Sequence, residues 1–170
     1  MKNGGNRIAW VFLAVALGVT ALQLVNYFPR LPERMATHFD AAGNANGWMS
    51  KRGFFQFQFA MLGIMGLAFG LLPRWLDRIP NALINLPHKA YWLAPERRAA
   101  SLADLARQMA NLSALVLALL VIVGELTLRA NLRATPRLGA EVWWLLGGYS
   151  VLMVVWIVRL CRRFPRPPAA

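Results

Sequence analysis

Histidine, carboxylate and amide side chains gather in one polar stretch of this chain, residues 31–52. It holds His38, one of the chain's two histidines, followed closely by Asp40. Two such ligands are too few for a structural zinc site, which takes four. An EF-hand alignment also fails, because it puts Ala42 and Gly53 at the positions that need acids. We therefore interpret His38 as a hydrogen-bonded loop residue and expect no metal or other cofactor.

The other side chains of this stretch favour contact with a partner over catalysis. No serine or cysteine of the chain has a recognisable partner for nucleophilic catalysis. The chain also contains no glycine-rich phosphate-binding loop. Glycine and asparagine tolerate positive φ, so residues 41–48 predict consecutive turns. The partner-binding or ligand-binding candidates here are His38, Asp40, Asn44, Asn46, Trp48 and Lys51.

Glu125 is the only acid well inside an apolar segment of the sequence. An ionised carboxylate at mid-bilayer costs roughly 3 kcal/mol on insertion scales. One interpretation is a proton or cation site, or a polar anchor within a helix bundle. The other is an acid near the end of a helix that pairs with Arg129, four residues on. The sequence leaves both interpretations open.

Three apolar segments carry polar side chains at a similar predicted depth. In the first segment, Thr20, Gln23 and Asn26 recur every three residues, so they lie near one face of a helix. This pattern predicts a polar vestibule beneath the histidine-bearing loop. The alternative is that helix ends are simply more polar than helix centres. The vestibule candidates are Gln23, Asn26, Gln56, Gln58 and Glu125.

Four apolar segments must position these side chains. The chain is 58% hydrophobic and 15% charged, whereas a soluble domain has about 45–50% apolar and about 25% charged residues. About 20 helical residues cross a hydrocarbon core of about 30 Å. The alternation in FFQFQF does not predict a strand, because an isolated strand cannot satisfy its backbone in lipid. We predict an all-α integral membrane protein, a four-transmembrane-helix bundle. The predicted spans are residues 8–28, 54–72, 109–128 and 141–160.

The connections and the orientation follow from charge and from helix breakers. Pro29 and Pro32 end the first span, since proline lacks an amide hydrogen. Lys and Arg number 12 on the side of the termini and 7 on the other. The positive-inside rule therefore predicts cytoplasmic termini. We expect an ordered outer loop at 29–53, a cytoplasmic interfacial segment and helix extension at 73–108, and a basic tail at 161–170.

Charge also bears on the partners. The net charge is +12, yet the basic residues cluster at the ends of the apolar segments, where membrane helices place them. This excludes a nucleic-acid binder, which needs its basic residues on one face, and it predicts the lipid bilayer as a partner. In the second span, Gly66 and Gly70 have the spacing of a helix-packing motif, although glycine is also frequent in membrane helices. The helix-packing candidates are Gly63, Gly66 and Gly70.

Two blocks of this sequence resemble a known family. Residues 31–55, LPERMATHFDAAGNANGWMSKRGFF, resemble the signature of domain of unknown function 1648. That module also forms the N-terminal part of SdpI-type immunity proteins, which carry additional C-terminal spans that we do not expect here. Residues 85–98, NLPHKAYWLAPERR, resemble a second block of the same group. In the resemblance, the signature positions are His38, Gly43, Gly47 and Lys51. The candidate cytoplasmic motif is Asn85, Pro87, Tyr91, Trp92 and Arg97.

The resemblance implies a multi-pass protein of a bacterial cytoplasmic membrane. SdpI-type members resemble immunity and signalling factors that meet a membrane-active peptide or a protein partner. We therefore predict a non-enzymatic membrane protein that binds such a partner through its outer loop. One alternative is a small proton- or cation-coupled transporter or membrane enzyme centred on Glu125. The other is an accessory subunit that packs through Gly66 and Gly70.

Overall fold

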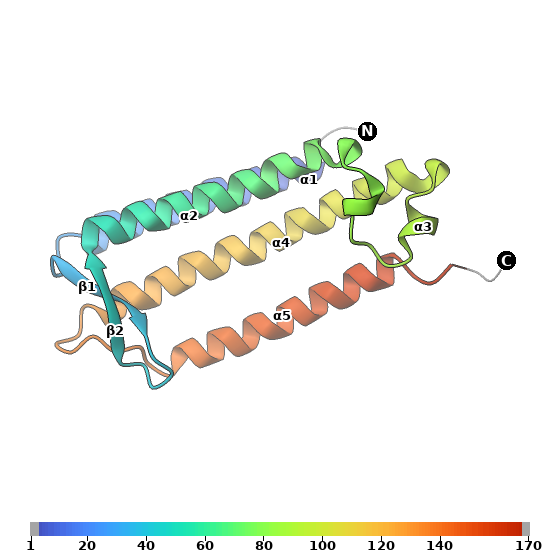
Figure 1. Cartoon of the computed structure of the whole chain (residues 1–170). Helices are drawn as coiled ribbons and strands as arrows, with labels where there is room; N and C mark the ends of the chain where they lie inside the picture. The colour runs from blue at the N-terminus through green and yellow to red at the C-terminus, as the bar shows by residue number, and fades with distance from the viewer. Residues whose placement is uncertain (1–3, 168–170) are drawn as a thin grey trace.

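Four long helices dominate the computed structural model, which describes residues 4–167 (Figure 1). All four are long and apolar enough to cross a membrane, which confirms the predicted number of spanning helices. The side of the membrane on which the termini lie remains a prediction. The helices are α1 (Gly4–Tyr27), α2 (Lys51–Leu71), α4 (Pro95–Ala130) and α5 (Glu141–Arg163).

Local sequence sets the helix ends. The Ser50 side chain caps α2, since its Oγ accepts a hydrogen bond from the Gly53 N–H at 3.0 Å. Pro95 begins α4, where its missing N–H costs nothing. α4 has 36 residues and is therefore about 54 Å long. It exceeds the hydrocarbon core, so its Pro95 end projects beyond the membrane.

Three of the long helices, α1, α2 and α4, share one core. Its centre is a cluster of buried side chains that includes Leu13, Leu62 and Leu117. A Cβ at Gly66 would lie 2.4 Å from the Leu13 side chain, and one at Gly70 would lie 2.9 Å from the Trp10 ring. These two glycines therefore let α1 approach α2 closely. The surface that each glycine leaves open is covered by a side chain of α1. Gly63 has no atom within 4 Å of such a Cβ and faces open space.

Helix α5 packs against α4 and has no buried residue along its length. Near its C-terminal end it is attached by Trp156, whose Nε1 donates to the Gln108 carbonyl at 3.0 Å. An ion pair between Arg163 and the buried Asp104 lies further along. The predicted four-helix bundle is therefore a three-helix core with a fourth helix against one side.

Short elements fill the end where α1 begins and α5 ends (Figure 1). Between α2 and α4 the chain forms three 3-10 turns and a short helix, consistent with its three prolines. Phe164, just past α5, is buried in their apolar cluster together with Leu76 and Leu93. These elements are η1 (Leu72–Arg74), η2 (Leu76–Arg78), η3 (Asn81–Leu83) and α3 (Lys89–Trp92).

A β-hairpin covers the opposite end of the helices (Figure 1). Strand β1 (Arg34–Phe39) pairs antiparallel with β2 (Ala45–Ser50), with irregular register around His38. The sequence predicted only turns here, and the all-α class omitted these strands. The register is irregular, and the sequence of β2, ANGWMS, does not alternate apolar and polar residues, so the pattern that predicts a strand is missing. Met35 anchors the hairpin in a buried cluster with Phe54 and other side chains of the helices.

Candidate functional site

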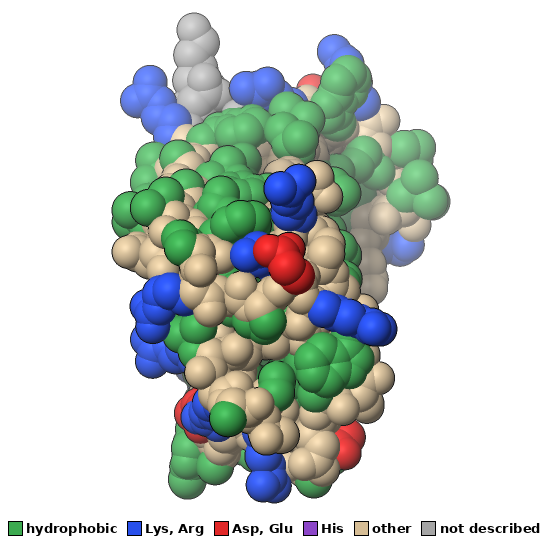
Figure 2. All heavy atoms as spheres, turned by 90° about the vertical axis from the view of Figure 1, so that its left-hand side faces the viewer, with side chains coloured by type: hydrophobic (Ala, Val, Ile, Leu, Met, Phe, Trp, Pro, Cys, Tyr) green, Lys and Arg blue, Asp and Glu red, His purple; other side chains and the backbone are tan. Residues whose placement is uncertain are grey.

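The hairpin and the loop between α4 and α5, residues 131–140, form a cap over one end of the helices (Figure 1). Figure 2 shows this end, with Lys and Arg side chains spread over the surface and fewer acids among them. The cap lies outside the spanning helices and carries many polar side chains. It is therefore the first place to look for recognition.

Asn131 clamps the hairpin to α4. The Ala36 N–H donates to Asn131 Oδ1 at 2.7 Å, and Asn131 Nδ2 donates back to the Ala36 carbonyl at 2.7 Å. Asn131 Nδ2 also donates to the Thr127 carbonyl at 2.9 Å, at the end of α4. Ala36 and Asn131 are both buried. The amide thus replaces a neighbouring strand for β1, because it supplies one donor and one acceptor to the same residue.

Lys51 joins the cap to the end of α1. Its ammonium donates to the carbonyls of Phe28 and Leu31, each at 3.3 Å, and lies 3.0 Å from the Glu33 carboxylate. A cation is favourable here because both carbonyls lie just beyond the C-terminal end of α1, which carries partial negative charge. Lys51 was a candidate for partner binding, but its side chain is buried and its ammonium group bonds to other residues of the protein.

Asp40 and Asn44 shape the tip of the hairpin. The Asn44 N–H donates to Asp40 Oδ1 at 2.8 Å, and the Asn44 amide donates to Asp40 Oδ2 at 3.2 Å. The backbone bond from Asn44 is the main reason that the pKa of Asp40 lies below its usual value, and Arg137 adds a smaller effect. A lowered folded-state pKa stabilises the tip above the unfolded-state pKa. This contribution is lost only as the pH falls through the folded-state value.

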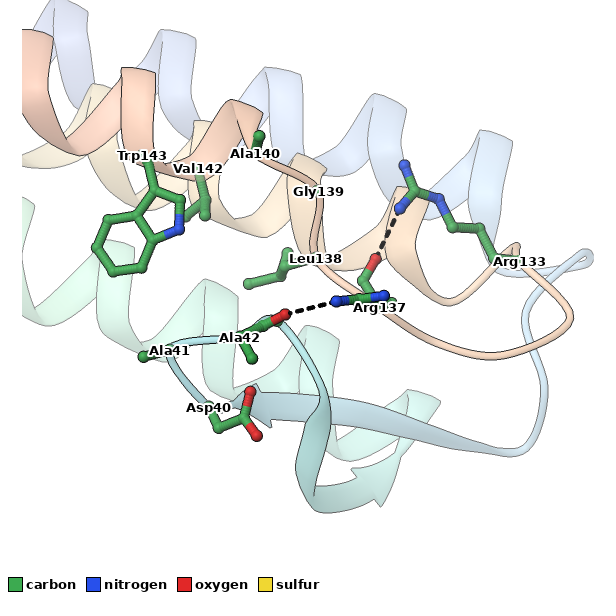
Figure 3. Close-up of a pocket in the computed structure, with 11 residues that line it drawn as sticks. Asp40, Ala41, Ala42, Arg133, Arg137, Leu138, Gly139, Ala140, Val142 and Trp143 are labelled. Atoms are coloured by element: carbon green, nitrogen blue, oxygen red, sulfur yellow. Dashed lines mark hydrogen bonds between the residues drawn. The ribbon is translucent and has the colours of Figure 1, made fainter.

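The tip docks on the loop between α4 and α5 (Figure 3). The Leu138 N–H donates to the Gly43 carbonyl at 3.0 Å, and the Arg137 guanidinium donates to the Ala42 carbonyl at 3.1 Å. Gly43 has a φ of 82°, and a Cβ there would lie 2.4 Å from the Leu138 oxygen. Glycine is therefore required at this position for two reasons, its conformation and its contact.

A pocket of about 410 Å³ lies between the hairpin tip and the start of α5. Asp40 and Arg137 contribute opposite charges to its wall, and Trp143 supplies an exposed ring (Figure 3). Arg133 closes one side by donating to the Arg137 carbonyl at 2.9 Å. The pocket can therefore accept a small polar group next to an aromatic surface. Sequence reasoning missed this pocket, because its two walls are almost 100 residues apart.

Three cap side chains are exposed to solvent. Trp48 is 44% exposed, and Asn46 is also exposed. His38 is exposed with its Nδ1 at 3.3 Å from Thr37 Oγ1, and it lies over Gly47, where a Cβ would come within 2.8 Å of the His38 Cβ. Within residues 4–167, no three His, Cys, Asp or Glu side chains lie close enough to hold a metal ion.

A second polar cluster surrounds Glu125, where α1 meets α4. Gln23 Nε2 donates to Glu125 Oε2 at 3.0 Å, and the Tyr27 hydroxyl donates to Oε1 at 2.5 Å. Arg129 Nε donates to the same Oε1 at 2.7 Å. The i,i+4 pair with Arg129 therefore coexists with a link between two helices. Sequence reasoning missed Tyr27, although it lies four residues after Gln23 and hence on the same helical face.

The predicted vestibule does not form a single chamber. Asn26 lies with Gln23 and Glu125 along a groove between α1 and α4. Gln58 instead approaches α4 from α2, where its Nε2 donates to the Leu120 carbonyl at 2.8 Å. Gln56 is exposed on α2. The prediction placed all five groups at one depth but could not fix the rotation of each helix about its axis.

The candidate cytoplasmic motif is held mainly by its aromatic residues. The Arg97 guanidinium lies 3.9 Å from the centre of the Tyr91 ring, and Arg97 Nε donates to the Tyr91 carbonyl at 3.0 Å. Trp92 stacks edge-on against Phe164 at 5.7 Å between ring centres. Asn85 and Pro87 are exposed. This arrangement connects the segment before α4 with the end of α5.

Four helices are long and apolar enough to cross a membrane, and Asn131 holds a hairpin over one end of them. These features define a small multi-pass membrane protein. Within it, residues 8–62 match the family described as Domain of unknown function (DUF1648). The match covers most of α1, the whole hairpin and the first half of α2, and it confirms the resemblance of residues 31–55 to this domain. No curated protein and no solved structure matches the chain.

Proposed function

We propose that this protein is a non-enzymatic membrane protein whose cap binds a peptide or protein partner at the membrane surface. The observation that carries the proposal is the exposure of Trp48, which is 44% accessible on a hairpin that is otherwise firmly held. An exposed tryptophan on a rigid frame offers a large contact area with little loss of conformational entropy. Such residues are enriched among those that dominate binding energy.

The rigidity of the hairpin supports the same proposal. Asn131 fixes β1, Lys51 fixes the start of α2, and Gly43 fixes the tip against the loop before α5. Each contact ties the cap to a different helix. A surface held in this way is already ordered before the partner arrives, so less entropy is lost on binding.

The resemblance to SdpI-type proteins suggests the class of partner, a membrane-active peptide. The Lys and Arg side chains spread over the cap (Figure 2) and the exposed ring of Trp48 suit contact with a peptide that lies in the headgroup layer. In this proposal the cap faces away from the cytoplasm, as the positive-inside rule predicts. The membrane is then the cytoplasmic membrane of a bacterium.

Replacement of Trp48 by alanine is expected to weaken partner binding without unfolding the protein. Loss of a central aromatic contact costs about 2 kcal/mol, which is about thirtyfold in Kd. The measurement is survival of cells that lack the gene, carry wild type or carry Trp48→Ala, across a panel of membrane-active peptides. Wild type should restore resistance to at least one peptide, and Trp48→Ala should not.

The matched control is Trp75→Ala. Trp75 is 52% exposed at the opposite end of the molecule, so its loss should leave resistance unchanged. Equal amounts of both variants in the membrane would show that folding is intact. Equal sensitivity of the deletion strain and wild type to every peptide would count against the proposal.

A second candidate function rests on Glu125 and its groove. A carboxylate that accepts bonds from Gln23, Tyr27 and Arg129, at the edge of an open groove, is an arrangement that can bind and release a proton or a cation. This candidate predicts a pH-dependent ion flux in proteoliposomes that Glu125→Gln abolishes. If Glu125 only links two helices, the variant should lower the melting temperature and no flux should be seen in wild type.

A further inference from the structure

A groove of about 550 Å³ runs between α1 and α4 at the end of the helices nearest the cap. Its side chains change character along its length. Val19, Leu22, Val121 and Ile122 line the part furthest from the cap, and each belongs to a spanning helix. Asn26 lies seven residues after Val19, about 10 Å closer to the cap along the helix.

The mouth of the groove is polar. Gln23 and Tyr27 lie here, but both side chains already donate to Glu125. Asn26 uses one amide hydrogen on the Leu22 carbonyl at 2.8 Å, so its second amide hydrogen can donate to a further acceptor. The groove thus changes from apolar to polar over about 10 Å along α1. This is roughly two thirds of the thickness of one leaflet in a hydrocarbon core of about 30 Å.

The charge at the mouth is positive. Glu125 is the only acid in the groove, and Arg129 neutralises it at 2.7 Å. Arg30 lies at the mouth, with its guanidinium carbon 5.7 Å from the centre of the Tyr27 ring. In the part of the chain that the structure describes, Arg30 forms no ion pair. Its charge is therefore free to meet an anion at the level of the headgroups.

We infer that this groove binds one anionic phospholipid from the leaflet on the cap side. The headgroup phosphate pairs with Arg30, and one acyl chain lies along Val19, Leu22 and Ile122. Between them, an ester carbonyl of the lipid accepts from the second amide hydrogen of Asn26. The order of side chains along the groove matches the order of groups in such a lipid. A peptide helix would fit the apolar part, but it would leave Arg30 without an anion.

The binding of the lipid does not depend on the cap partner. The groove lies between two helices, and none of its lining residues comes from the hairpin. Failure of the peptide-resistance experiment would therefore leave the lipid site untouched. Likewise, loss of the lipid site would not remove Trp48 from the cap surface.

The test is the thermal stability of the purified protein in a neutral detergent, with added phosphatidylglycerol, phosphatidylcholine or inorganic phosphate. Wild type should melt at a higher temperature with phosphatidylglycerol than with either of the others. Arg30→Gln should need about fivefold more phosphatidylglycerol for the same shift, as expected for one arginine near a charged lipid. Shifts are compared with each variant's own lipid-free value, so a small loss of stability does not obscure the result.

Two further variants complete the experiment. Ile122→Trp fills the apolar part of the groove from a position that is 43% exposed, and it should reduce the shift as Arg30→Gln does. Arg34→Gln is the matched control, because Arg34 is exposed on β1 outside the groove. Equal shifts with phosphatidylcholine, an equal shift with inorganic phosphate, or an undiminished response of Arg30→Gln would each overturn the inference.

Discussion

Replacement of Asn131 by leucine is expected to lower the free energy of unfolding by about 2–5 kcal/mol, since it leaves a buried N–H and a buried carbonyl without partners. Both groups belong to Ala36, which is fully buried and bonds to Asn131 twice at 2.7 Å. Leucine has the same number of side-chain heavy atoms in the same branched arrangement, so the substitution leaves no cavity and the expected loss comes from the hydrogen bonds. Chemical or thermal unfolding in detergent measures the difference.

The control for this prediction is Asn46→Leu. Asn46 is an exposed asparagine of the same hairpin, and its replacement should change stability by less than about 0.5 kcal/mol. Hydrogen exchange at Ala36 gives an independent readout. Its amide should exchange much faster in Asn131→Leu, while amides in the middle of α2 keep their protection. Unchanged protection at Ala36 would show that the amide clamp is not what holds β1.

Replacement of Gly43 by alanine is expected to cost about 2–4 kcal/mol, from backbone strain at positive φ and from loss of one hydrogen bond. The φ of Gly43 is 82°, and the new Cβ would lie 2.4 Å from the Leu138 oxygen. Because that atom belongs to the backbone, the contact can be relieved only if the tip moves off the loop before α5. Unfolding in detergent measures the cost, and proteolysis of residues 131–140 reports the exposed loop.

Gly43→Asn separates the two causes. Asparagine tolerates a positive φ better than alanine does, but its Cβ meets the same oxygen. A cost close to that of Gly43→Ala would identify the contact with Leu138 as the main term. Gly63→Ala is the control, because a Cβ there meets no atom within 4 Å. Proteolysis of the loop in Gly63→Ala at the rate seen in Gly43→Ala would contradict the assignment.

The helices could be predicted from the sequence because lipid imposes a simple requirement on each of them separately. A run of apolar residues such as 8–28 is long enough to cross the core whatever its neighbours do. The pairing of helices could not be predicted in this way. Tyr27 reaches Glu125 at 2.5 Å only because α1 and α4 have particular rotations about their axes, which depend on Gly66 and on the packing of the core.

The hairpin could not be predicted from the sequence, because its support lies elsewhere in the chain. Thr37 and Asn46 fall at irregularities in the register. The burial of β2 alternates along the strand, but its sequence, ANGWMS, does not alternate apolar and polar residues. Asn131, which completes the edge of β1, comes 95 residues after Ala36. A local pattern cannot reveal a partner at that separation. The signal that was available is an asparagine three residues after the third predicted span.

That separation has a consequence for how the protein is made. A ribosome adds about 5–20 residues per second, so Asn131 follows Ala36, 95 positions earlier, by roughly 5–20 s. During this interval the hairpin has already emerged next to its membrane helices. The edge of β1 that later bonds to Asn131 is then open to water or to a chaperone. The third membrane segment must insert before that edge closes. Nascent chains arrested before residue 131 should therefore carry a hairpin that proteases can still cut.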